Sequence, residues 1–164
     1  FRQRKNNGLI VEAFKRLNPE NSVVVFVGRG AEEEILKESA KNFENIIFIG
    51  HTNTPIDYLQ SADILISASL AEGLPNTVLE AMSCGLPCIL SDIGPHEEII
   101  ENTEAGVIFD RNSIDKLCSC ICDTSLWNLE EKSKIARNIA VENFGIKSLA
   151  AKYELIYKEV INMK

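Results

Sequence analysis

The sequence predicts an α/β protein, a Rossmann-like domain of three layers in which helices cover both faces of a parallel sheet. Short apolar runs alternate with segments of helical periodicity as far as residue 110. The apolar runs are rich in β-branched residues and lack regular polar alternation, which is typical of strands buried on both faces. From residue 113 onward the pattern is helical throughout. Strand–helix–strand units make right-handed crossovers, so the helices should lie on the two faces of one sheet.

Five segments are expected to be strands, and most run directly into a loop that contains glycine or polar residues. They are SVVVFVG at 22–28, NIIFIG at 45–50, DILISAS at 63–69, PCILSD at 87–92 and AGVIFD at 105–110.

The first helix should run from Leu9 to Leu17, because Asn18-Pro19 cannot continue it. Further helices are expected at 32–43, 55–62, directly after Pro75, and at 95–102, 113–123, 126–144 and 148–162. In sheets of this kind ligands bind beyond the carboxyl ends of the strands, so the loops that follow the strands are the candidate site.

The length of 164 residues fits one domain, here 1–164, and the net charge of −7 argues against nucleic acid as a partner. No apolar run reaches the roughly 18–20 residues that cross a bilayer, so any membrane association should come from parts outside this chain. The sequence begins with Phe1 rather than methionine, and we expect it to be a fragment of a longer protein.

Metal and disulfide chemistry are not expected. The five cysteines form no CxxC pair and the chain has only two histidines, so we expect no metal site. An odd number of cysteines suggests free thiols in a reducing cytoplasm, where we expect the protein to be located.

Two glycine-containing loops follow the first two strands. Gly28 and Gly30 form a GxG, but Glu33 stands where the dinucleotide-binding GxGxxG needs its third glycine. These glycines either let a ligand or a neighbouring loop approach the backbone, or simply make a tight turn. Gly50 ends the second strand, and His51 after it is either a surface residue or a ligand contact.

The stretch AEGLPNTVLEAMSCGLP contains two glutamates with different explanations. Thr77 and Glu80 fit a capping box, in which Thr77 caps the helix and Glu80 bonds back to it. Glu72 has no such explanation, because Gly73-Leu74-Pro75 should place it in a loop beside the helix N-terminus. A helix N-terminus is an anion site, so a carboxylate next to it suits a ligand that carries both phosphate and hydroxyl groups.

Two more segments can be interpreted either as ordinary structural features or as parts of a ligand site. In SDIGPHEEII, Glu97 and Glu98 fit ordinary helix-start acidity. The cluster of Arg2, Arg4 and Lys5 is either a solvated end or one wall of a phosphate site.

Taken together, these motifs resemble those of the retaining glycosyltransferases of family 4, the "group 1" transferases. The pattern E-G-L-P-N-x-x-L-E-A-M at 72–82, followed by G-x-P at 85–87, is similar to the E-x7-E segment of that family. Further matches are R-x-x-K-N at 2–6, V-G-x-G at 27–30, S-D-x-G at 91–94 and A-G-V-I-F at 105–109. One departure is Gly94-Pro95-His96, where the family often has paired glycines.

The resemblance implies one half of a GT-B enzyme, the C-terminal half that binds a UDP- or GDP-sugar as substrate, with no cofactor. Glu72 would contact the donor sugar and Glu80 the ribose hydroxyls, while Lys5 would bind the diphosphate. The arginine that usually accompanies this lysine lies five residues before it, so Arg2 is the candidate substitute. The remaining donor-binding positions that the resemblance implies are Gly28, Gly30, Gly50, His51, Gly73, Leu74, Asn76 and Thr77.

The implied partner is an N-terminal acceptor-binding half, toward which the helix within 146–164 would pack. The implied activity is sugar transfer in polysaccharide or glycoconjugate synthesis. Two alternatives remain open at this point: a non-catalytic nucleotide-sugar-binding module, and another GT-B enzyme such as an epimerase.

Overall fold

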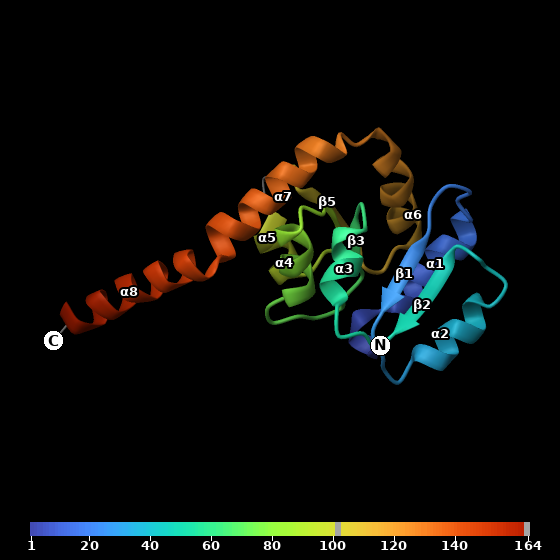
Figure 1. The fold of residues 1–164 in the computed structure, drawn as a ribbon, viewed down its shortest axis with the longest axis horizontal. Coiled ribbons are helices and arrows are strands. Elements are labelled where there is room, and N and C mark those ends of the chain that lie inside the picture. Colours follow the sequence, from blue (N-terminus) through green and yellow to red (C-terminus); the bar gives the residue numbers. More distant parts are fainter. Residues whose placement is uncertain (101–102, 163–164) are drawn as a thin grey trace.

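The structure is a computed structural model that describes residues 1–100 and 103–162 (Figure 1). The strands are β1 (Val24–Val27), β2 (Ile46–Gly50), β3 (Leu65–Ser67), β4 (Cys88–Ser91) and β5 (Gly106–Phe109). All five expected strands are therefore confirmed, each somewhat shorter than its sequence segment.

The helices also follow the expected order. They are η1 (Gln3–Lys5), α1 (Asn7–Leu17), α2 (Glu33–Ala40), α3 (Pro55–Gln60), α4 (Asn76–Ser83), α5 (Gly94–Ile100), α6 (Ile114–Asp123), η2 (Thr124–Leu126), α7 (Leu129–Phe144) and α8 (Ile146–Asn162). The last two residues of the helix expected at 95–102 and the end of the segment 146–164 lie outside the described residues.

All pairings between strands are parallel, but the strands form two hydrogen-bonded sheets. One sheet has the order β1-β2 and the other β3-β4-β5. In the second sheet Leu65 pairs with Cys88 and Cys88 with Gly106, so the three strands end at one edge. Residues Phe1–Lys5 link the two sheets at that edge, because the Phe1 amine donates to the Arg29 carbonyl (2.5 Å) and Leu70 N–H donates to the Arg4 carbonyl (2.8 Å).

Successive residues of β4 belong to different hydrophobic cores, which shows the three layers directly. All four residues of β4 are buried. Ile89 belongs to a core with α1, α2 and α6, whereas Cys88 and Leu90 belong to a second core with α4, α5 and α7. Because successive strand residues point to opposite faces, helices cover both faces of this sheet.

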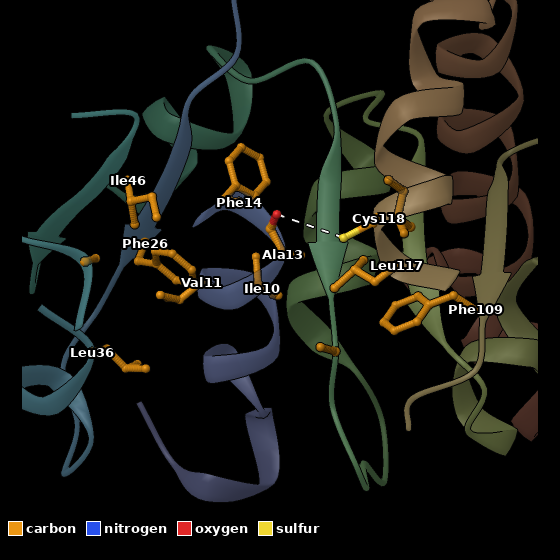
Figure 2. Close-up of a cluster of buried hydrophobic side chains, with 13 residues drawn as sticks. Ile10, Val11, Ala13, Phe14, Phe26, Leu36, Ile46, Phe109, Leu117 and Cys118 are labelled. Carbon is orange, nitrogen blue, oxygen red and sulfur yellow. Dashed lines mark hydrogen bonds between the residues drawn. The ribbon is translucent and has the colours of Figure 1, made fainter. Parts of the chain in front are cut away.

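Figure 2 shows the first of these cores. The inner residues of α1 lie between side chains from both sheets, such as Phe26 of β1 and Phe109 of β5. Across this core, Cys118 of α6 donates a weak hydrogen bond to the Ala13 carbonyl (4.0 Å). Helix α1 therefore holds the two sheets together.

The prediction that β1 is buried on both faces is wrong. Val25 is 41% exposed, and Ile47 and Ile49 on the neighbouring strand are also exposed. Phe26 and Ile46 face the core made with α1 and α2, so those helices cover one face of this sheet only. β-Branched content marked the strand correctly, but how many helices cover it depends on the tertiary fold.

Helix α8 extends away from the rest of the molecule (Figure 1). None of its described residues is buried, and its exposed side chains include Leu155, Ile156, Tyr157 and Val160. Within the described ranges, no helix combines the length and the apolarity that crossing a membrane requires.

Candidate functional site

The centre of the candidate site is the Glu72 carboxylate, in the loop between β3 and α4. Lys5 Nζ donates to Glu72 Oε1 at 2.6 Å, and Ser69 Oγ donates to the same oxygen at 2.8 Å. Arg4 Nη1 lies 3.5 Å from the other oxygen, Oε2. With these partners the Glu72 side chain is only 5% exposed. The loop position was predicted. The structure adds that the carboxylate is fixed by its contacts with Lys5, Ser69 and Arg4.

Lys5 reaches Glu72 because the N-terminal segment is fixed at the edge of the sheet. The short helix η1 ends at Lys5, where Asn6 turns the chain with a left-handed φ of 50°. The hydrogen bond from Leu70 N–H to the Arg4 carbonyl then ties η1 to the loop after β3. Lys5 and Glu72 are 67 residues apart in sequence. The Leu70–Arg4 backbone hydrogen bond brings the segments that carry them together.

Opposing effects set the protonation of Glu72. Burial alone raises its pKa, but the hydrogen bonds from Lys5 and Ser69 and the charges of Lys5 and Arg4 more than offset burial. The net pKa lies below the ordinary value of 4.5, so Glu72 is ionised at neutral pH.

A second line of hydrogen bonds reaches Glu72 from β4 and α5. Ser91 Oγ donates to the Ser69 carbonyl at 2.6 Å. His96 Nδ1 lies 3.0 Å from the Ser91 carbonyl and 3.2 Å from Ser91 Oγ. Ser69, Ser91 and His96 are all fully buried.

The N-terminus of α4 lies directly after Glu72 in the chain. Gly73, Leu74, Asn76 and Thr77 are exposed there, as a binding surface requires. An added Cβ at Gly73 would meet no atom within 4 Å, so the backbone at this point is open to an approaching ligand.

The predicted capping box is wrong. Pro75 is the N-cap and Asn76 the first helical residue, so Thr77 lies inside the helix, and no side chain caps it. Glu80 is exposed instead of bonding back to the cap. Because Glu80 follows Asn76 by four residues, the two lie on one face of the helix, toward its N-terminal end.

The glycine loops of the β1-β2 sheet meet each other, since Gly28 N–H donates to the Gly50 carbonyl at 2.7 Å. Gly28 has a φ of 129°, in the region that favours glycine. A Cβ at Gly30 would lie 1.9 Å from the Phe1 nitrogen, so the neighbour that Gly30 admits is Phe1. His51 is exposed, and its role as a ligand contact stays a prediction.

The two N-terminal arginines lie in different surroundings, and the role of Arg2 at the diphosphate stays a prediction. Arg2 is exposed, and the structure does not bring it to Glu72, whereas Arg4 contacts both the Glu72 carboxylate and the Ala71 carbonyl. The sequence named Arg4 only as a member of the basic cluster, and it missed Ser69, Ser91 and His96 as parts of the site. Only the pairing of β3 with β4 brings residues 69 and 91 together.

All five cysteines are free thiols, and burial raises the pKa of Cys88 to about 12. Among residues 1–100 and 103–162, no group of three or more His, Cys, Asp or Glu side chains is arranged to hold a metal ion.

The fold and this edge site define a Rossmann-like domain of the kind that forms one half of a GT-B glycosyltransferase. The chain belongs to the family of glycosyl transferases group 1, whose match covers residues 1–139.

Curated relatives match almost all of the chain. It is 29% identical over 171 residues to the UDP-Gal:alpha-D-GlcNAc-diphosphoundecaprenol alpha-1,3-galactosyltransferase of Escherichia coli, covering 96% of this chain and 43% of that protein. It is 27% identical to the N-acetyl-alpha-D-glucosaminyl L-malate synthase of Bacillus anthracis, covering 98% of this chain and 44% of that protein.

A solved glycosyltransferase from Rickettsia africae superposes with a TM-score of 0.84 at 25% identity, over 96% of this chain and 45% of that one. The chain thus spans less than half the length of the relatives that it matches.

Proposed function

We propose that the full-length protein is a retaining glycosyltransferase that moves a sugar from a nucleoside-diphosphate sugar to an acceptor, and that this chain is its donor-binding half. The observation that carries the proposal is the Lys5–Glu72 pair, 2.6 Å long, beside the exposed N-terminus of α4. It combines a cation and helix amides for phosphate with a carboxylate for hydroxyl groups.

The proposed roles follow from position. Glu72 accepts hydrogen bonds from the donor sugar, and the positive N-terminal end of α4 faces the diphosphate. Lys5 gives one N–H to Glu72 and keeps its remaining donors for phosphate oxygens. Glu80, exposed on the same face of α4 as Asn76, accepts from the ribose hydroxyls.

The same geometry supports the reaction. Cleavage of the sugar–phosphate bond develops negative charge on the leaving nucleoside diphosphate, and Lys5 with the α4 amides stabilises that charge. Glu72 Oε1 already accepts hydrogen bonds from Lys5 and Ser69, which lowers its nucleophilicity. We therefore assign Glu72 the orientation of the donor, with the acceptor attacking on the face that the phosphate leaves.

The donor is proposed to be a UDP-sugar ahead of a GDP-sugar, and the product a polysaccharide or glycoconjugate. The support is the E. coli relative, whose name includes UDP-Gal and a diphosphoundecaprenol acceptor.

The acceptor is proposed to bind a second half of the enzyme. Helix α8 supports this proposal, because its exposed Leu155, Ile156 and Val160 form an apolar surface with nothing packed on it among the described residues. A second domain packed on α8 would remove that surface from water.

The test uses the full-length protein with a panel of nucleotide sugars. Glu72→Ala should lower kcat by about 100- to 1,000-fold while UDP still raises the melting temperature, because the nucleotide keeps Lys5 and α4. Glu130→Ala is the matched control, since Glu130 is an exposed glutamate in the first turn of α7. Near-normal turnover by Glu72→Ala, or no stabilisation by millimolar UDP or GDP, would contradict the proposal.

A further inference from the structure

His96 is a buried histidine with one engaged and one unengaged ring nitrogen. It is 0% exposed, in α5, and faces Ser91 through Nδ1. Its Nε2 is buried without a hydrogen-bond partner in the described part of the chain. The sequence analysis assigned no role to this residue.

The hydrogen bonds fix which nitrogen carries the proton. Ser91 has one hydroxyl proton, and it is donated to the Ser69 carbonyl, which can only accept. The two atoms that face His96 Nδ1 are then the Ser91 carbonyl oxygen and the acceptor side of Ser91 Oγ. Because both accept, Nδ1 must donate, and neutral His96 carries its proton on Nδ1.

The ring is neutral at physiological pH. Burial lowers the pKa of His96 below 6.5, and nearby Lys5 lowers it further, against the opposite effects of the Ser91 carbonyl and Glu72. Nδ1 is thus a permanent donor in this site.

One continuous path joins this donor to the candidate catalytic carboxylate. Nδ1–H holds Ser91, Ser91 Oγ holds the Ser69 carbonyl at 2.6 Å, and Ser69 Oγ holds Glu72 Oε1 at 2.8 Å. The path crosses from α5 through the end of β4 to the loop after β3. Lys5 holds Glu72 from the other side, so the path decides where the carboxylate points rather than whether it is charged.

We propose that His96 is a positioning residue for Glu72, acting through Ser91 and Ser69 to hold the carboxylate in the orientation that the donor sugar requires. The proposal rests on the proposed role of Glu72. Removing the Nδ1 donor should lower kcat about 10- to 100-fold, the cost of a small misplacement of a catalytic group. The donor KM and the affinity for UDP should change less than threefold, because Lys5 and α4 are untouched.

Isosteric variants of the full-length enzyme separate this role from simple core filling. The side-chain amide of His96→Asn can replace Nδ1–H, whereas that of His96→Gln reaches the position of Nε2, and His96→Leu restores only volume. We expect His96→Asn to keep kcat within about threefold, and His96→Gln and His96→Leu to show the full loss. Equal kcat in the Asn and Leu variants would overturn the proposal, and so would a loss that appears in KM.

Two further measurements keep the outcome decisive if His96→Leu does not fold. Ser91→Ala removes only one hydroxyl and should show the same loss of kcat. ¹⁵N NMR of the His96 ring should show the proton on Nδ1, and a proton on Nε2 would refute the path directly. If Glu72→Ala is inactive while Ser91→Ala and His96→Leu are fully active, only this inference fails; if Glu72→Ala is itself active, the proposed function fails.

Discussion

The two sheets are built from the same strand–helix units, yet they differ in how deeply their strands are buried and in how the segments after the strands are held. Every residue of β4 is buried, whereas Val25 of β1 is 41% exposed. The loop after β3, the end of β4 and helix α5 hold Glu72, Ser91 and His96 in a hydrogen-bonded network, while the loops after β1 and β2 contain glycine turns and the exposed His51.

This difference shows why the Glu72 carboxylate is held in one orientation beside the β3-β4-β5 sheet. Glu72 is held by Ser69, and Ser69 is held by a strand whose two faces are packed. In such an interior, side chains have few alternative rotamers and little water competes for their hydrogen bonds. The β1-β2 sheet, open on one face, is better suited to a surface that a ligand or another domain covers.

The largest expected effect tests the packing difference itself. Leu90→Ala in β4 should lower the free energy of unfolding by about 2–5 kcal/mol, because Leu90 is 0% exposed and the lost side chain leaves a cavity. Val25→Ala in β1 should cost less than about 1 kcal/mol, since half-exposed strand positions lose little packing. Urea denaturation of both variants measures the two costs, and equal costs would contradict the division into a packed and an open sheet.

The next effect separates two glycines that the sequence analysis placed together at the donor. Gly30→Ala should lower the free energy of unfolding by about 1–3 kcal/mol, because its Cβ would overlap the Phe1 backbone at 1.9 Å. Gly73→Ala should leave it within about 0.5 kcal/mol, since no atom lies within 4 Å of the added Cβ.

The two substitutions should affect the donor KM in the opposite order, with the larger change in Gly73→Ala. Gly73→Ala brings a methyl group to the loop between Glu72 and α4, and should raise the donor KM of the full-length enzyme. Gly30→Ala, measured below its melting temperature, should change the KM less. A stable Gly30→Ala with a raised donor KM would show that Gly30 faces the ligand after all.

The sequence predicted features that depend on neighbouring residues, but not those that depend on tertiary packing. β-Branched runs located all five strands, because strand formation depends on neighbouring residues, but the covered faces of β1 depend on helices elsewhere in the chain. Likewise Glu72 stood out because no local rule explained it. Ser91 and His96 did not, since their function depends on the register that places β4 beside β3. The capping box failed by two residues, because Pro75 rather than Thr77 became the N-cap.

The smallest effect compares the acid sensitivity of two ion pairs, Lys5–Glu72 at the site and Lys134–Glu130 on the exposed side of α7. The pKa of Glu130 is lowered chiefly by its hydrogen bond from Lys134, and that of Glu72 is lowered by Lys5, Ser69 and Arg4 against the cost of burial. A carboxyl whose pKa is lower in the folded state contributes stability above its unfolded pKa, and loses it as the pH falls through the folded value.

Lys5→Met should therefore lower the melting temperature at pH 7 and converge with the parent as the pH falls through the lowered pKa of Glu72, because the carboxyl is then protonated in both proteins. Lys134→Met should show the same direction with a smaller difference at pH 7, and 1 M NaCl should abolish that difference, because salt screens exposed pairs more than buried ones. Melting curves from pH 3 to 7 at two salt concentrations make the measurement. If the Lys5→Met difference also vanished in 1 M salt, the Glu72 carboxylate would have to be as accessible to water as Glu130, and the packed sheet would not be what holds it.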